Sequence, residues 1–295
     1  MNTLQYIRKC DADFKERLQD VADAVARSFN EGRSIRLISL SGPTCSGKTT
    51  AAAMIADRLE EHGKRVHVIS IDDFYYDRDY LHEISRKKGL DVIDYDSEET
   101  IDLASLDSFV EEALSGESAH CPTFDFKTGN RRGYRAVESG ESDVFIFEGI
   151  QAIYPSVTAL FEPYGFIGVY IAPLTPLCVG DKVFLPDDIR LMRRIVRDAH
   201  FRNTDADFTL SLWKSVRANE ERSIFPYVNN CAYRIDSTHS YELGVLKPYL
   251  EEYLRDIGAS SENFSTAREI LSRVEEIEPI DSSLIDDRSL YREFV

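Results

Sequence analysis

The clearest chemistry in this sequence lies in GPTCSGKT at positions 42–49, directly after the apolar run IRLISLS. The spacing G-x-x-x-x-G-K-[ST] is that of a phosphate-binding P-loop. Gly42 and Gly47 allow backbone conformations that a side chain would forbid, so successive N–H groups can form an anion nest at the start of a helix. We expect Lys48 to reach the β- and γ-phosphates and the Thr49 hydroxyl to bind Mg²⁺.

A helical pattern, TAAAMIADRLEEHG, follows the loop, and this context favours a nucleotide triphosphate site over a chance match. Cys45 occupies a position that the motif leaves free, and we interpret it as a small filler residue. The predicted nucleotide-binding residues are Gly42, Pro43, Thr44, Cys45, Ser46, Gly47, Lys48, Thr49 and Thr50.

Carboxylates follow two further strand-like segments. SIDDFYYDR places Asp72 and Asp73 at the end of one, and VFIFEG places Glu148 at the end of another. Asp72, which we favour over Asp73, could accept a hydroxyl proton or hold the metal through water, although a helix N-cap is the alternative. Glu148 has the position of a Walker B carboxylate, which associates with the metal.

Arginines cluster in DIRLMRRIVRDAHFRNTD at positions 188–205. Four of them recur at i, i+3, i+4 and i+7 on one helix face, and a fifth follows a turn later; they are Arg190, Arg193, Arg194, Arg197 and Arg202. Guanidinium groups bind phosphate oxygens bidentately, so this helix is predicted to close over the phosphates as a lid. The alternative is a solvated face paired with the neighbouring aspartates.

Composition limits the function classes. The 295 residues carry 35 basic and 52 acidic side chains, a formal charge of −17, which argues against non-specific nucleic-acid binding. The five cysteines are scattered, without C-x-x-C pairs, so reduced thiols are expected. The sequence has neither a long apolar run nor a signal-peptide pattern, so we expect a cytoplasmic protein that does not bind membranes.

Strand and helix patterns alternate along the chain. Strands are expected at 35–41, 66–71, 143–149, 165–172 and 231–236, and helices at 50–63, 105–116 and 188–201. This alternation predicts an α/β fold with a parallel sheet flanked by helices, with ligands at the carboxyl ends of the strands. We predict an N-terminal helical segment at 1–34, a P-loop kinase domain with a helical lid at 35–257, and a C-terminal appendage at 258–295.

Five motifs in this order resemble the uridine kinase / phosphoribulokinase family of P-loop kinases, over roughly residues 35–250. They are GPTCSGKT, SIDDFYYDR, PTFDFKTGNRR, VFIFEG and RRIVRDAHFR. The stretches LWKSVRANEERSIFPY and YELGVLKPYL are similar to a bacterial uridine kinase-like branch. The resemblance implies a kinase that uses ATP and Mg²⁺ to phosphorylate a small-molecule hydroxyl, and it is compatible with a dimer or tetramer.

The resemblance also implies roles for individual residues. Asp72 matches the catalytic base, Tyr75 lines the acceptor pocket, and Tyr95 with Asp96 matches an aromatic–Asp pair whose Asp holds ribose hydroxyls. Arg194 would contact the acceptor sugar, and Arg197 and Arg202 would be lid arginines near the phosphates. Lys48 belongs to the catalytic set, and Thr49, Asp72 and Glu148 form the metal-associated set.

The sequence departs from the family where uridine kinases read the base. Phe124, Gly129 and Thr204 stand where the family has Tyr, His and Arg, and Phe124 is retained as a substrate-side candidate. Loss of polar groups removes discrimination between bases, so a nucleoside is the first expectation but not the only one.

Two alternatives stay open. The first is a kinase for another hydroxyl compound, such as a sugar phosphate, an amino acid or a vitamin precursor. If the acceptor carried a phosphate, basic residues near FDFKTGNRR could bind it: Lys127, Arg131, Arg132 and Arg135. The second is a nucleotide-binding regulatory switch, which the acceptor-activating position of Asp72 disfavours.

Overall fold

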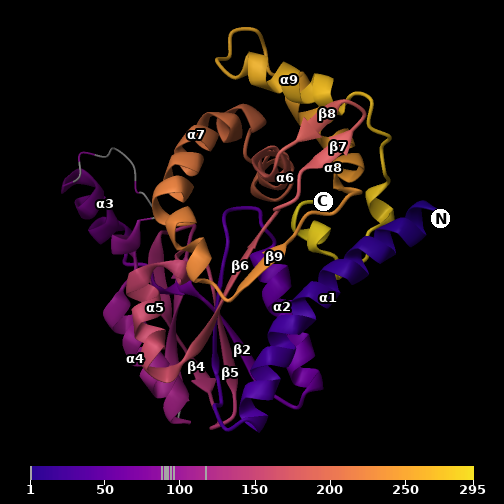
Figure 1. Ribbon diagram of the computed structural model, residues 1–295. Coiled ribbons are helices and arrows are strands. Elements are labelled where there is room, and N and C mark those ends of the chain that lie inside the picture. Colours follow the sequence, from indigo (N-terminus) through magenta and orange to yellow (C-terminus); the bar gives the residue numbers. More distant parts are fainter. Residues whose placement is uncertain (1, 88, 90–92, 94, 96, 117) are drawn as a thin grey trace.

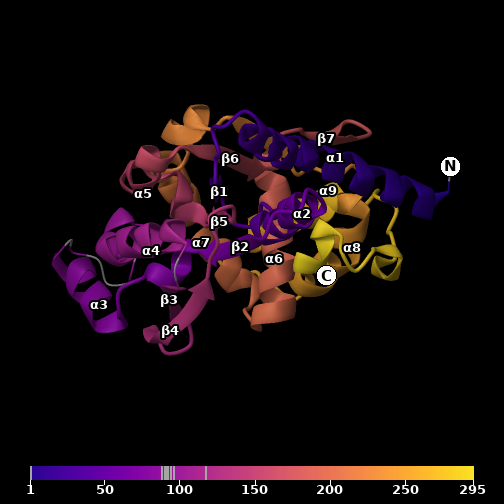
Figure 2. The ribbon, with the colours of Figure 1, turned by 90° about the horizontal axis from the view of Figure 1, so that it is seen from below.

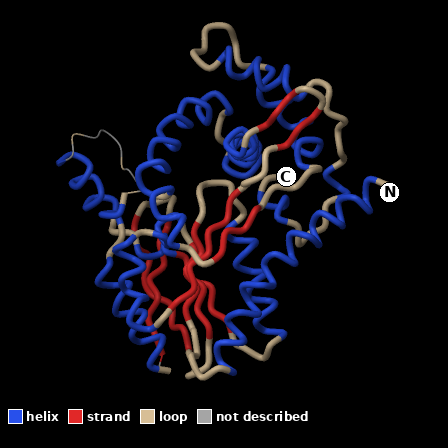
Figure 3. The backbone as a smooth tube through the Cα atoms, in the orientation of Figure 1, coloured by secondary structure: helices blue, strands red, loops and turns tan. Residues whose placement is uncertain are grey.

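The computed structural model describes residues 2–87, 89, 93, 95, 97–116 and 118–295. A parallel five-stranded sheet has the order β2-β5-β1-β6-β9. Its strands are β1 (Leu37–Ser41), β2 (Val66–Ser70), β5 (Val144–Glu148), β6 (Phe166–Ala172) and β9 (Tyr233–Asp236). The predicted α/β class with a parallel, helix-flanked sheet is confirmed (Figures 1 and 3).

Helices cover both faces of the sheet (Figures 1 and 2). On one side lie α1 (Thr3–Asn30) and α2 (Lys48–Glu61), and on the other α4 (Leu103–Ser115) and α5 (Pro155–Phe161). β1 explains this layering, because Ile38 and Leu40 enter one core cluster while Leu37 enters the other. Alternate side chains of a strand point to opposite faces, so a strand with apolar residues on both faces is covered twice.

Further helices lie around the carboxyl ends of the strands. Helices α6 (Pro186–Arg202) and α7 (Ala206–Ser223) pack together there, and α8 (Glu242–Arg255) packs on α6 (Figure 1). α6 begins at Pro186, which suits the first helical position, and ends before Asn203 in the left-handed conformation. The other described helices are α3 (Arg78–Lys87) and α9 (Phe264–Val274).

Two hairpins were missing from the sequence-based prediction. One pairs β3 (Ser118–Asp125) with β4 (Asn130–Glu138), and the other pairs β7 (Leu177–Val179) with β8 (Lys182–Phe184). β4 reads NRRGYRAVE, and its charged residues interrupt the apolar alternation that marks a strand. β7 and β8 are three residues each, too short for a periodic signal.

The segments at both ends of the chain contribute side chains to the core beside the sheet. Phe14 of α1, together with Tyr291 and Phe294 near the C-terminal end, belongs to the same buried cluster as β1. The domain limits at 34/35 and 257/258 stay predictions, but neither flanking segment is peripheral in the structure. Within the described residues, no helix is both long and apolar enough to span a membrane.

Candidate active site

The P-loop connects β1 to α2. A Cβ on Gly42 would overlap the carbonyl oxygen of Ile171 in β6, so the loop lies tightly against the sheet. Gly47 has φ +90°, which glycine adopts without strain, and α2 starts directly after it without a side-chain cap. The first-turn N–H groups of α2 are therefore directed toward the loop, where an anion can accept from them.

Two polar side chains of the loop fit a phosphate. The Lys48 Nζ donates to the carbonyl oxygens of Gly42 at 3.0 Å and Pro43 at 3.1 Å, which holds the ammonium group across the loop. The Ser46 hydroxyl is buried and has no hydrogen-bond partner among the described residues. Buried polar groups are normally satisfied, and phosphate oxygens would satisfy this one.

The first two arginines of α6 hold the loop backbone rather than facing the cavity. Arg190 donates to the carbonyl oxygen of Thr44 at 3.4 Å, and Arg193 donates to that of Cys45 at 3.3 Å. Both side chains are buried, and each forms a two-pronged ion pair: Arg190 with Glu220 of α7, and Arg193 with Glu242 of α8. Ion pairing was the alternative left open for these arginines, and Arg190 and Arg193 do form ion pairs, with buried carboxylates from other helices. The predicted phosphate-contacting arginines are the other three.

The other three arginines line a cavity of about 920 Å³ beside the P-loop. Arg194, Arg197 and Arg202 all pair with the buried Asp198, at 3.2, 2.7 and 3.5 Å. Arg197 also lies 3.4 Å from the Thr44 hydroxyl in the loop. Three guanidinium groups thus share one carboxylate, which leaves an excess of positive charge where phosphates would lie.

Asp72 lines the same cavity from a short 3-10 turn, Ile71–Phe74, after β2. Burial raises the pKa of Asp72, while the positive charge of Lys48 opposes the shift. The pKa of Glu148, at the end of β5, is also raised by burial, again opposed by Lys48, and the charge of Asp72 adds to the rise. The two carboxyl groups and the loop lysine therefore form one electrostatic cluster.

Asp73 has a different environment. Its Oδ1 accepts from the backbone N–H of Phe124 at 3.1 Å, and its Oδ2 lies 3.6 Å from Arg135. These contacts tie the turn to the β3–β4 hairpin. Of the two adjacent aspartates, Asp72 is the one that lines the cavity.

Aromatic side chains form the part of the cavity away from the loop. Tyr75 and Tyr95 line it, and the Tyr75 hydroxyl donates to the carbonyl oxygen of Tyr95 at 3.1 Å. Phe124 packs edge-on against Tyr75 and is 7% exposed, whereas Phe126 is 60% exposed and lines the cavity. Asp96 lies outside the described residues, so its predicted role has no structural counterpart.

Comparison with known proteins agrees with this geometry. The family model "Phosphoribulokinase / Uridine kinase family" matches residues 37–241. The chain belongs to this family. It is 28% identical over 176 residues to a uridine kinase of Lactobacillus helveticus, covering 59% of this chain and 73% of that protein. It is 31% identical over 176 residues to the chloroplastic uridine/cytidine kinase UKL1 of Arabidopsis thaliana, covering 59% of this chain and 32% of that protein.

A solved structure from Silicibacter sp. TM1040, described as a candidate fructose transport system kinase, is 20% identical with a TM-score of 0.50. It covers 72% of this chain and 98% of that chain, and this likeness concerns the fold. Family membership makes this protein a kinase, a phosphotransferase that acts on an alcohol group of a small molecule. It also implies ATP as the phosphoryl donor.

Sequence reasoning missed several cavity residues of this kinase. They come from the β3–β4 turn, the segment after β5, the end of α6, and α7 with the residue after it: Phe126, Ile150, Tyr154, Phe201, Val216, Asn219, Glu220 and Ile224. Gln151 lies behind them, and its amide donates to the Tyr75 hydroxyl at 2.6 Å and to the Tyr95 carbonyl oxygen at 2.8 Å. Phe126, Phe201 and the residues of α7 lie inside the stretches FDFKTGNRR, RRIVRDAHFR and LWKSVRANEERSIFPY, but nothing in those stretches marked these particular side chains as cavity residues.

Three of the four basic residues proposed for a phosphorylated acceptor are engaged elsewhere. Arg131 pairs with Asp102 at 3.0 Å and donates to backbone carbonyls of the turn after β2. Arg132 pairs with Asp125 of β3, and Arg135 lies 3.6 Å from Asp73 in the turn after β2. Lys127 is the member of this set that lines the cavity.

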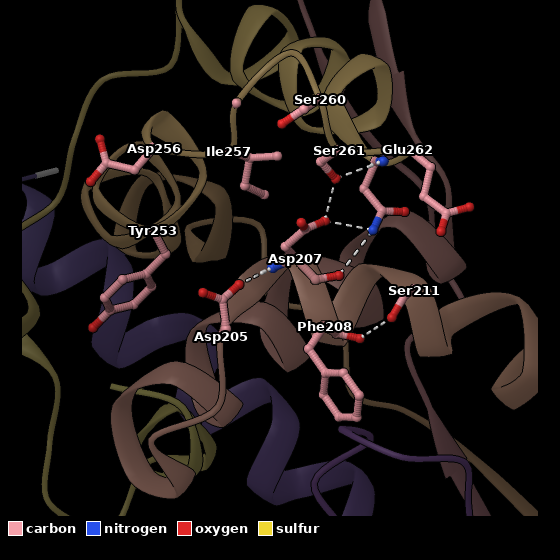
Figure 4. A pocket seen from close by; sticks show the side chains of 12 residues that line it. Asp205, Asp207, Phe208, Ser211, Tyr253, Asp256, Ile257, Ser260, Ser261 and Glu262 are labelled. Carbon is pink, nitrogen blue, oxygen red and sulfur yellow. Dashed lines mark hydrogen bonds between the residues drawn. The ribbon is translucent and has the colours of Figure 1, made fainter.

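A second cavity, of about 770 Å³, lies between α7 and the segment after α8 (Figure 4). Asp205, Asp207, Asp256 and Glu262 line it. Asp207 accepts hydrogen bonds from Ser261 at 2.7 Å and from Asn263 at 2.6 Å, which attaches this segment to α7. Its negative charge makes it unsuitable for a polyphosphate.

The residues predicted for Mg²⁺ fit a metal held largely by phosphates and water. Among the described residues, no group of three or more His, Cys, Asp or Glu side chains could form a metal cage. Mg²⁺ commonly keeps several waters and is bound through one or two carboxylates beside substrate phosphates. Thr49, in the first turn of α2, and the carboxyl groups of Asp72 and Glu148 match this arrangement.

Proposed function

We propose that this kinase transfers the γ-phosphoryl group of ATP, in the presence of Mg²⁺, to a hydroxyl group of a nucleoside. The observation that carries the proposal is the cavity itself. One continuous lining joins Thr44 of the P-loop, the carboxyl group of Asp72, the arginines of α6 and an aromatic wall. A donor phosphate and an aromatic acceptor would therefore meet beside a carboxylate.

Each residue has a role in this proposal. Lys48 and the loop N–H groups hold the β- and γ-phosphates, and Thr49 with Glu148 would hold Mg²⁺, which neutralises phosphate charge when bound. Asp72 orients the acceptor hydroxyl and takes its proton; its raised pKa makes it a better proton acceptor than an ordinary aspartate. Arg194, Arg197 and Arg202 stabilise charge on the transferred group, so positioning and electrostatics supply most of the rate.

The aromatic wall favours a nucleoside over a small aliphatic acceptor. Tyr75, Tyr95, Phe126 and Tyr154 line the cavity, and such rings can contact a flat base. The matched relatives from Lactobacillus helveticus and Arabidopsis thaliana are named as uridine or uridine/cytidine kinases, which supports the same acceptor class. The aromatic lining provides few groups that distinguish one base from another, so broad base tolerance is expected.

A phosphorylated acceptor is the second candidate, and Lys127 is the observation that favours it. One ammonium group at the cavity could bind one acceptor phosphate. The pairing of Arg131, Arg132 and Arg135 with acidic side chains weakens this candidate. A regulatory switch is less favoured than either, since it does not need an acceptor cavity beside Asp72.

The test is ATP consumption, measured with nucleosides, sugar phosphates and amino acids as acceptors. A nucleoside is expected to raise turnover well above the basal rate, and Asp72→Asn is expected to abolish transfer while ATP binding stays nearly unchanged. Asp79→Asn, which alters an exposed carboxylate at the start of α3, is the matched control. If only sugar phosphates raised ATP turnover, a phosphorylated acceptor would replace the nucleoside as the proposed substrate. Retained transfer in Asp72→Asn would exclude Asp72 as the base.

A further inference from the structure

The N-terminus of α2 carries a contact that neither the motif nor the family comparison accounts for. The Glu293 Oε1 accepts from the backbone N–H of Thr50 at 2.9 Å and from the Thr50 hydroxyl at 2.5 Å. Thr50 is the third residue of α2, so its N–H is one of the donors left free at a helix start. A side chain 243 positions away in the sequence thus binds to the nucleotide loop.

The neighbouring residues hold Glu293 in this place. Leu290 packs on Gly47, so closely that a Cβ on this glycine would overlap its side chain. Tyr291 is fully buried, and its hydroxyl accepts from Arg193 at 2.8 Å. The same guanidinium donates to the Cys45 carbonyl oxygen, so one arginine binds both the loop and the C-terminal segment.

The charge of Glu293 acts on the catalytic groups as well. It helps to raise the pKa of the Glu148 carboxyl, after the larger contribution of burial. It also contributes to the raised pKa of Arg197. The carboxylate therefore lies within electrostatic range of both the metal-associated residue and a lid arginine.

We propose that Glu293 sets the nucleotide affinity of this kinase by competing with the nucleotide phosphates for the N-terminus of α2. The inference rests on the proposed nucleotide site. P-loop N–H groups bind the α- and β-phosphates of a nucleotide, and Thr50, directly after the motif, is one of the predicted nucleotide-binding residues. A carboxylate is an anion that binds the same donors, and two anions cannot share one N–H at hydrogen-bond distance.

The competition has a defined consequence. Nucleotide binding must displace Glu293 from Thr50, so the apparent affinity is lowered by the fraction of molecules in which the contact is formed. By reciprocity, bound nucleotide must loosen the segment from Ser289 to Val295. Any condition that releases this segment from Thr50 would increase the affinity for ATP. The segment is therefore an inhibitory element within the chain.

The experiment measures the dissociation constant of MgADP by calorimetry for the full chain and for three variants. Glu293→Gln keeps the size of the side chain and removes its charge, and Glu293→Ala removes the contact. Asp287→Asn is the matched control, because this carboxylate lies in the same region but is fully exposed. We expect the Gln variant to bind on the order of 10-fold more tightly, since a charge-assisted hydrogen bond becomes a weaker neutral one. The control should not change.

Trypsin cleavage provides a second readout. Arg292 adjoins Glu293 in a short 3-10 turn and is half-buried, whereas Arg288 is exposed. MgADP is expected to accelerate cleavage after Arg292 in the unmodified chain, with little change at sites elsewhere. Equal affinities in all four proteins together with unchanged cleavage would overturn the inference while leaving the nucleotide site intact. If none of them binds MgADP, the proposed function fails, and this inference fails with it.

Discussion

Arg193→Met tests the finding that two arginines of α6 are structural. Arg193 and Glu242 are both fully buried, and they form hydrogen bonds of 2.7 and 3.1 Å. The variant leaves the Glu242 carboxylate without its counter-charge. Breaking a buried ion pair from one side costs about 3–5 kcal/mol of folding free energy. The variant also removes the Arg193 bonds to Cys45 in the loop and to Tyr291, so we expect a loss in the upper part of that range.

Arg194→Met provides the contrast. Its partner, Asp198, still pairs with Arg197 and Arg202 in this variant. Loss of the Arg194 pair should therefore lower the free energy of unfolding by roughly 1 kcal/mol or less. This variant is expected to lose transfer activity while it stays folded. The two neighbouring arginines should therefore show opposite profiles: Arg193→Met loses mainly stability, and Arg194→Met loses mainly activity.

Urea denaturation measures both variants. The single tryptophan, Trp213 in α7, serves as the fluorescent probe, and linear extrapolation provides the free energy of unfolding. A double variant, Arg193→Met with Glu242→Leu, removes both charges and should recover at least half of the loss, because apolar pairs often replace buried ion pairs without penalty. A loss below about 1 kcal/mol in Arg193→Met, or a double variant less stable than the single one, would refute the reasoning.

Four further predictions concern the cavity. Lys48→Ala should weaken ATP binding and turnover together, as titration calorimetry and a coupled assay would show; an unaffected variant would remove the P-loop from the mechanism. Burial raises the pKa of Asp72, so kcat/KM should fall as pH drops through a value above that of an ordinary aspartate. The folded state therefore keeps the Asp72 proton to a higher pH than the unfolded state, and folding stability falls as rising pH removes this proton. Asp72→Asn should raise the free energy of unfolding at neutral pH by about 0.5–2 kcal/mol, measured by urea denaturation. EDTA should abolish turnover without changing the circular dichroism spectrum, and Mg²⁺ should restore it. Asp198→Asn should lower kcat more than it raises the KM for ATP, because three arginines lose their common partner.

Local motifs made much of the site predictable. The loop from Gly42 to Thr49 and the carboxylate Asp72 follow strands directly, and parallel strands deliver their carboxyl ends to one edge of the sheet. The alternation of the five sheet strands with helices could be predicted for the same reason, but the two hairpins could not. Each of these inferences depends on residues that are adjacent in the sequence.

The unpredicted features depend on distant contacts. Glu220 and Glu242, which neutralise Arg190 and Arg193, lie 30 and 49 residues further along the chain. Helical spacing shows that arginines share a face, but it does not show which of them another helix will cover. The bond between Glu293 and Thr50 spans 243 residues, and a lone glutamate near the end of a chain carries no signal for it.

The different roles of the arginines in α6 follow from the positions of their acidic partners. A helix rises about 1.5 Å per residue, so Arg190 and Arg202 lie about 18 Å apart along the axis. At the first end, Arg193 pairs with the buried Glu242. Arg190 pairs with the buried Glu220 and with Asp187, and Arg217 pairs with the same two carboxylates. These charges are balanced, so Arg190 and Arg193 can hold loop carbonyls permanently. At the other end three arginines share Asp198, so this part of α6 itself carries 3 − 1 = 2 unbalanced positive charges. In a protein with a formal charge of −17, this unbalanced end is where a polyanion gains most from binding.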